Sequence, residues 1–373
     1  MIMKKLASLI LISISCFAFC QDQSEKATAS QVELEYTLWF NQLNQYLLDS
    51  EDSYEVAMGV SALLNGALQM PKNNGMKNQD LLPQLGSVLN ELIAQKDLKP
   101  ETLDLLIVWC FKAAIVNNCH RERLLEKHQQ SQPDNMHVYF KPLQIAVEEN
   151  NQNLGLRTIA RMSQAKNNHR TIHTTEQFNK TIDNYIENNP LPESYLNYLS
   201  TDKNLSNLTN KKVKVDDLAI KNMAKAAIKT AYAMFYEQPD LNPLYFLCKT
   251  NMELLQQCLN ITETLIKNSN TITATGLGYA ISMGIYESQN NKPMFDEVKK
   301  KQESYKQLIE CLSLATLSPN PVNEIFDPKY QQIQLENISE FDRIKYLAQY
   351  VYEKHKDDNP EQINPATCFT TTK

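Results

Sequence analysis

The sequence predicts an all-α protein made of stacked antiparallel helical hairpins, an α-solenoid arrangement. Apolar residues recur at intervals of three and four along most of the chain, which is the period of a helix with one buried face. Only 8 of the 373 residues are glycine, so the tight turns that connect strands have little to build on. Turn signals at Pro100, Pro133 and Asn167 lie 33 and 34 residues apart, a spacing typical of a repeated helical hairpin.

Residues 1–20 have the pattern of a signal peptide. Two lysines precede the uncharged, mostly apolar run Leu6–Phe19, which is too short to span a bilayer. Cleavage after Ala18 or after Cys20 satisfies the preference for small residues before the cut, and we favour Cys20. We therefore expect an exported protein, periplasmic or secreted, in a setting that permits disulfides.

The N-terminal region, residues 21–188, is expected to consist of helical repeats. The helix that Pro100 opens is apolar on nearly all sides and should therefore be central. Apolar stripes and turn residues place helices over about 30–47, 51–70, 80–95, 100–116, 121–130 and 174–188.

A polar stretch, residues 189–212, is the expected boundary with a second helical region, residues 213–356. An aspartate N-cap opens this C-terminal region. Its helices are expected over about 217–235, 251–267, 272–286, 293–315 and 340–354. The tail, residues 357–373, has two prolines and little to bury, so we expect it to be poorly ordered apart from Cys368.

Residues 100–167 resemble a degenerate tetratricopeptide repeat. The turn Gln132-Pro133-Asp134-Asn135 precedes an aromatic residue, Tyr139, as in that family. Small and apolar residues then follow in the family's order: Leu143, Ala146, Gly155, Leu156, Ile159, Met162 and Ala165. Pro142 departs from the pattern because it falls inside the first helix of the pair. The resemblance implies a concave surface that binds peptides or proteins, and it implies no catalysis.

The charge balance argues against a nucleic-acid partner. The formal net charge is −6, and only six of the basic residues are arginine. No basic stripe is available to displace counterions from a phosphate backbone. We also expect no membrane span once the signal segment is removed.

A glycine-rich stretch is the nearest approach to a nucleotide-binding or nucleophile motif. Gly276, Ala280 and Gly284 are four residues apart, which would give a helix one smooth face for close packing. No strand precedes them, so both catalytic motifs fail. We interpret the stretch as structural.

One pair of histidines has the spacing of metal ligands. His169 and His173 would share a helix face, with Glu176 nearby, and a zinc site is conceivable. The stretch has the composition of a polar turn, however, and the other histidines are scattered, so exposed polar residues are the favoured interpretation. We expect no catalytic, cofactor-binding or metal-binding residue, and no cofactor.

Six cysteines remain after residue 20, and six cysteines allow fifteen pairings. Cys110 and Cys119 are nine residues apart, Cys248 and Cys258 are ten apart, and each pair straddles a predicted turn. These four are the disulfide candidates. A catalytic thiol is the alternative, but the apolar helix around Cys110 would raise its pKa.

These observations favour an exported, non-enzymatic binding or scaffold protein that engages a protein or peptide. A secreted effector with a host target shares this chemistry and differs in destination. The third hypothesis is an α-helical hydrolase or metal enzyme whose site forms only in three dimensions. Convergent His, Asp or Cys side chains in one cleft would favour the enzyme, whereas a bare concave helical face would favour binding.

Overall fold

The computed structural model describes residues 23–69, 78–112, 119–201, 217–319, 324 and 326–370. Across these residues the chain is helical and forms no strand, which confirms the predicted all-α class. The predicted signal segment, much of the 189–212 boundary stretch, and the expected end of the Pro100 helix near Val116 lie outside the described residues.

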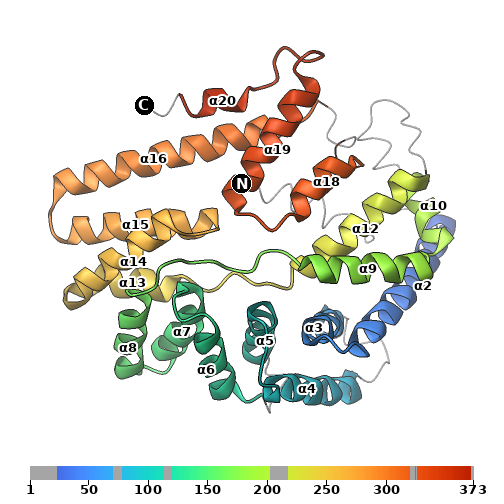
Figure 1. Cartoon of the computed structure of the whole chain (residues 1–373), viewed down its shortest axis with the longest axis horizontal. Coiled ribbons are helices and arrows are strands. Elements are labelled where there is room, and N and C mark those ends of the chain that lie inside the picture. The colour runs from blue at the N-terminus through green and yellow to red at the C-terminus, as the bar shows by residue number, and fades with distance from the viewer. Residues whose placement is uncertain are drawn as a thin grey trace.

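The first helices form an arc along the lower edge of the molecule in Figure 1. They are α2 (Gln23–Leu48), α3 (Ser53–Gln69), α4 (Asn78–Ala94), α5 (Pro100–Lys112), α6 (Arg121–Ser131), η1 (Met136–Tyr139), α7 (Phe140–Glu148) and α8 (Gln152–Met162). Pro142 lies in the first turn of α7, where the missing backbone N–H costs no intrahelical hydrogen bond. The proline is therefore compatible with a helix there.

The later helices lie above this arc and at its ends (Figure 1). They are α9 (Glu176–Asn188), α10 (Glu193–Thr201), α12 (Asp217–Ala233), α13 (Asn242–Thr250), η2 (Met252–Leu254), α14 (Leu255–Lys267), α15 (Ile272–Ser288), α16 (Lys292–Ala315), α18 (Pro328–Leu335), α19 (Glu340–His355) and α20 (Pro365–Cys368). The sequence did not predict α10, α13 or α18, which have only eight or nine residues each. Helices this short carry too few periodic positions to be recognised.

Two helix pairs are joined by the same asparagine turn. Asn150 (φ 52°) ends the turn after α7, and Asn290 (φ 53°) ends the turn after α15. The next residue in each case, Asn151 or Asn291, caps the following helix by accepting a backbone N–H at its side-chain oxygen. Asparagine tolerates the left-handed region, so this pair of residues can reverse the chain without glycine.

The two large hydrophobic clusters do not follow the predicted boundary. One joins α2–α6 to α9, α10 and α12. The other joins η1, α7 and α8 to α13–α15. Each cluster therefore contains residues from both predicted regions, 21–188 and 213–356, and the two regions share their cores.

The link between α8 and α9 crosses the middle of the molecule in extended form (Figure 1). Asn135 forms two hydrogen bonds with the backbone of His169, accepting its N–H at 3.0 Å and donating to its carbonyl at 2.7 Å. Asn270 does the same to the next residue, Arg170, at 2.9 and 2.7 Å. The two asparagine side chains thus satisfy backbone groups that a β-ladder would otherwise satisfy.

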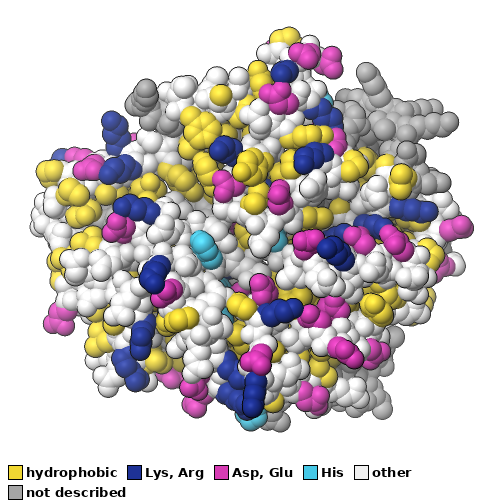
Figure 2. Space-filling view, in the orientation of Figure 1, with side chains coloured by type: hydrophobic (Ala, Val, Ile, Leu, Met, Phe, Trp, Pro, Cys, Tyr) yellow, Lys and Arg dark blue, Asp and Glu magenta, His cyan; other side chains and the backbone are white. Residues whose placement is uncertain are grey.

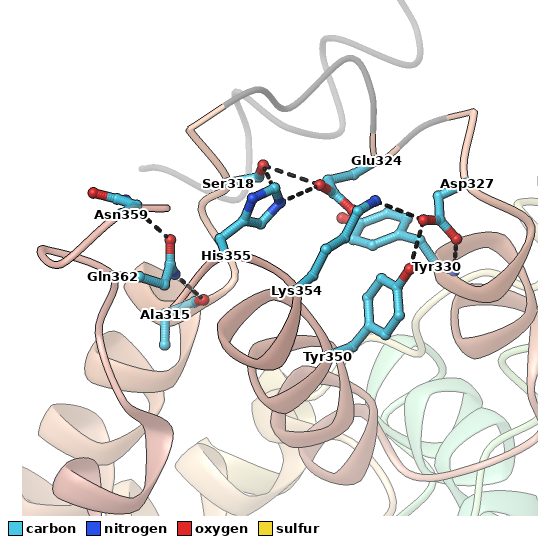
Figure 3. Close-up of polar contacts among 10 residues, drawn as sticks. All are labelled: Ala315, Ser318, Glu324, Asp327, Tyr330, Tyr350, Lys354, His355, Asn359 and Gln362. Carbon is cyan, nitrogen blue, oxygen red and sulfur yellow. Dashed lines mark hydrogen bonds and ion pairs between the residues drawn. The ribbon is translucent and has the colours of Figure 1, made fainter. Parts of the chain in front are cut away.

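The expectation of a poorly ordered tail is wrong for residues 357–370. Helix α20 packs on α16 and α19. Gln362 is buried and donates to the carbonyl of Ala315 at 3.1 Å (Figure 3). Cys368 is fully buried and bonds to Cys311. The buried disulfide and this hydrogen bond stabilise the ordered tail. The composition of the tail did not indicate either of them. Residues 371–373 lie outside the described ones.

The close helix contact in the glycine-rich stretch is made by Gly278 and not by the predicted face. A Cβ at Gly278 would lie 2.8 Å from Ile266 and 3.1 Å from the carbonyl of Thr262. A Cβ at Gly276 would have no atom within 4 Å, and one at Gly284 would meet only the Lys249 side chain at 3.6 Å. Helix α14 packs against the side of α15 that carries Gly278, because Ile281 and Ile285 lie there and are buried.

None of the described helices is both long enough and apolar enough to cross a bilayer.

Candidate functional site

A cavity of about 250 Å³ lies where α5, α6, η1, α7, the central link and the segment after α12 meet. Its apolar wall comes from α5 and α7, and its polar groups come from all of these elements. The lining side chains are Asp104, Ile107, Val108, Phe111, His128, His137, Phe140, Lys141, Gln144, Arg170, Thr171, Tyr236, Glu237, Gln238, Pro239 and Asp240. A concave, mostly pre-formed site with a few convergent polar groups is the usual form of a ligand pocket.

Asp104 is the most highly connected polar residue of the cavity. Its Oδ1 lies 2.7 Å from Nε2 of His128 and 3.5 Å from Nε2 of His137. Its Oδ2 accepts a short hydrogen bond from the hydroxyl of Thr171. One carboxylate therefore joins α5, α6, η1 and the central link.

The partners of Asp104 also determine its charge. Burial raises the pKa of this carboxyl, but the neighbouring His137 and the hydrogen bond from His128 more than offset that effect, and the pKa lies well below its usual range. Asp104 is consequently a carboxylate at neutral pH, although it is only 6% exposed. The signal for it was present in the sequence, because Asp104 lies between two leucines of an apolar helix and an acid buried there needs a partner.

Arg170 brings a second charge to the cavity wall, and it forms no ion pair with a described carboxylate. Its Nε is buried and has no hydrogen-bond partner among the described residues. Burial lowers the pKa of its guanidinium, and the charges of Glu340 and Asp104 act in the opposite direction. Because Nε is enclosed, an anion in the cavity would meet the outer Nη groups of this guanidinium.

Lys141 is the other cation of the lining. Its Nζ lies 5.0 Å from the centre of the Phe111 ring and donates to Gln144 at 2.9 Å. Burial lowers the pKa of Lys141. Glu237 and Asp240 line the cavity from exposed positions and so place acidic groups at its mouth. Over the face drawn in Figure 2, acidic and basic side chains are intermixed, with histidines near the centre.

Three observations on the described residues bear on whether this arrangement could serve catalysis. Nδ1 of His128, the nitrogen that an Asp–His pair would use as a base, is enclosed and has no hydrogen-bond partner among the described residues. The lining contains neither serine nor cysteine, and the Thr171 hydroxyl donates to Asp104. In the described part of the chain, no three His, Cys, Asp or Glu side chains are arranged to hold a metal ion.

A second polar cluster, near the C-terminus, includes a serine, a histidine and a glutamate (Figure 3). Nε2 of His355 lies 3.2 Å from the Ser318 hydroxyl and 2.7 Å from Oε1 of Glu324. A catalytic triad needs its acid and its nucleophile on opposite ring nitrogens, and here both meet the same one. Lys354 lies between Glu324 and Asp327, at 3.0 and 2.6 Å, and its ammonium offsets one of the two negative charges. The cluster connects α19 to the segment before α18.

The predicted histidine pair takes no part in a common site. His173 is buried, and its Nε2 accepts a hydrogen bond from Arg343. His169 is exposed, and Glu176 pairs with Lys180 at 2.7 Å. His173 and Glu176 thus have different partners, and the residues that do converge, His128 and His137, were among the scattered histidines of the sequence.

Three disulfides join cysteines of the described residues, each with a Cα–Cα distance of 5.6 Å. They are Cys110–Cys119, Cys248–Cys258 and Cys311–Cys368. The first two join the four candidates chosen for their proximity in sequence. Cys110 directly precedes Phe111, so the first disulfide ties the end of α5 that lines the cavity to Cys119. Together the disulfides indicate an oxidising, exported environment.

Comparisons with protein-family models, with curated proteins and with solved structures give no match to this chain.

Proposed function

We propose that the protein is an exported, non-enzymatic binding protein whose cavity holds a small ligand or the end of a peptide. The observation that carries this proposal is the cavity itself, which collects two cations, a fixed carboxylate and an apolar wall from six separate elements. Its volume, about 250 Å³, lies just below the usual range for small-molecule sites. A ligand of amino-acid size, or one terminal residue of a longer chain, fits such a space.

The proposed location is the periplasm or the exterior of the cell. The disulfides require an oxidising compartment, and residues 1–20 have the features of an export signal. A secreted effector would use the same cavity and differs only in where its partner resides.

The hydrolase alternative gains one observation, the convergence of Asp104, His128 and His137 in a single cavity. It lacks a nucleophile in the lining and an accessible base on His128. Turnover in a broad hydrolase screen, abolished by His137→Gln, would favour this alternative.

We also propose that residues 100–167 form a degenerate tetratricopeptide-like unit, the α-solenoid part of the fold. The support is that α5 packs on α6 and α7 packs on α8, with Asn135 at the turn between the pairs. In this reading the cavity lies on the side of the unit that the central link covers, and a peptide partner would approach from there.

Native mass spectrometry of the oxidised full chain with a pool of amino acids and tripeptides tests the binding proposal. Gln144→Trp places an indole in the cavity lining, whereas Val147→Trp adds the same group to an exposed position of the same helix. We expect a bound species with the wild type and with Val147→Trp, and none with Gln144→Trp. Equal binding by all three proteins, or binding by none, would contradict the proposal.

A further inference from the structure

The geometry points to a carboxylate as the group of the ligand that enters this cavity, with Arg170 as its main partner and Lys141 as the second cation. This inference rests on the proposed function and specifies the ligand's chemistry. Both free amino acids and the C-termini of peptides present such a group, together with an apolar side chain for the wall formed by Ile107, Val108 and Phe140.

Arg170 is held in place by its backbone rather than by its side chain. Asn270 bonds both its N–H and its carbonyl, and these bonds fix the Cα in the extended link. The side chain lines the main cavity and also a small pocket of about 10 Å³ beside it. The guanidinium forms no ion pair with any described carboxylate, and its Nε is enclosed. A ligand in the cavity would therefore meet the outer Nη groups of Arg170.

The buried carboxylate of the cavity, Asp104, is already engaged by other residues. Both oxygens of Asp104 are occupied, one by the two histidines and the other by Thr171. A guanidinium presents its donors in a planar fork that matches a carboxylate, and it binds this group more strongly than it binds a neutral acceptor. Glu340 and Asp104 favour the charged form of Arg170 without forming an ion pair with it, so the carboxylate of a ligand is the partner that we infer for this guanidinium.

Lys141 supplies the second positive charge of the cavity, and two acidic residues lie on the same lining. Lys141 is held against Phe111 on the cavity wall, while Glu237 and Asp240 lie at exposed positions of the rim. Glu237 and Asp240 also favour the charged form of Lys141, so they help to keep this cation available to the carboxylate of the ligand.

Isothermal titration calorimetry of the oxidised full chain can test the inference with matched probes. The probes are leucine, Ala-Ala-Leu with a free C-terminus, the same peptide with a C-terminal amide, and leucinamide. We expect each free carboxylate to bind about ten- to a hundredfold more tightly than its amide, because amidation removes a charge-assisted hydrogen bond. Leucine and Ala-Ala-Leu distinguish a free amino acid from a peptide terminus as the preferred source.

Arg170→Gln should weaken binding of the free carboxylates and abolish their preference over the amides. Lys141→Gln should reduce the preference without abolishing it. Arg157→Gln, on an exposed arginine of α8, serves as the matched control and should change nothing. Equal unfolding temperatures of the variants would show that each is folded.

The outcomes separate this inference from the proposed function. Amides that bind as tightly as the acids, or an Arg170→Gln variant that keeps the preference, would overturn the carboxylate inference. If such amide binding is also blocked by Gln144→Trp, the cavity is still a binding site and the proposed function stands. Failure of all four probes to bind would overturn the inference as well.

Discussion

At the scale of single residues, Asp104 joins four segments of the chain through one buried side chain. Its removal in Asp104→Ala would leave His128, which is 2% exposed, and His137 without their shared acceptor. Breaking a buried ion pair from one side costs about 3 to 5 kcal/mol. We expect a loss of about that size in the free energy of unfolding, measured by urea denaturation.

The control for this variant is an exposed ion pair. Asp134 and Lys166 are 2.6 Å apart, but both side chains are more than half exposed, at 56% and 76%. Asp134→Ala should therefore cost about 1 kcal/mol or less. If the two variants lost equal amounts, Asp104 would not be the joint between elements that its contacts indicate.

His173 predicts a loss of stability in mild acid. Its burial, together with the charge of Arg343, lowers its pKa from 6.5 to about 3, and a backbone hydrogen bond with Ile338 only partly opposes this. Between these two values the unfolded chain binds a proton at His173 and the folded chain does not. Stability should consequently fall as the pH decreases from 6.5, by about 1 to 2 kcal/mol at pH 5.

Urea titrations at pH 7, 6 and 5 measure this effect, with His173→Gln as the reference. The glutamine oxygen can still accept from Arg343 but does not titrate in this range. The wild type should lose more stability than the variant over the same pH interval. Parallel losses would show that other groups cause the acid sensitivity.

At the scale of elements, the contact between α14 and α15 predicts opposite effects for two neighbouring glycines. Gly278→Ala would place a methyl group 2.8 Å from Ile266 and 3.1 Å from the carbonyl of Thr262, so the helices would have to separate. We expect a loss of about 1 to 3 kcal/mol. Gly276→Ala meets no atom within 4 Å and should stabilise the helix by about 1 kcal/mol.

Thermal and urea unfolding of the two variants give the sign of each effect. A neutral or stabilising Gly278→Ala would mean that α14 and α15 can move apart without cost.

The helices also differ in how well their positions can be predicted from the sequence alone. Long helices such as α15 and α16 carry enough turns for their apolar period to be recognised. The candidate site could not be recognised in the same way, since Asp104 lies 24 residues from His128 and further still from His137. His169 and His173 were candidates because residues four apart would share one face of a helix. The residues that do converge come from separate helices and are brought together only by tertiary packing.

At the scale of the whole molecule, the three disulfides close loops of very different length. Cys110–Cys119 spans nine residues and Cys311–Cys368 spans 57. On the chain-entropy model the short loop contributes about 2 to 3 kcal/mol and the long one about 4 kcal/mol. Replacing both cysteines of each pair by alanine should therefore destabilise the protein more for Cys311–Cys368.

Non-reducing peptide mapping of the oxidised protein checks the connectivity first. We expect Cys110 linked to Cys119 and Cys248 linked to Cys258. Recovery of Cys110 as a free thiol, or linked to Cys311 or Cys368, would contradict the pairing.

The interleaved cores have a consequence for the order in which the protein can fold as it leaves the cell. The hydrophobic cluster that joins η1, α7 and α8 to α13–α15 packs these elements together, although the latter helices are about a hundred residues later in the chain. An exported chain emerges with its N-terminus first. The apolar faces of α7 and α8 therefore stay exposed until α9, α10 and α12 have been translocated and α13–α15 follow. Slow export would prolong this exposure, and a chaperone that shields helical apolar faces would act during that interval.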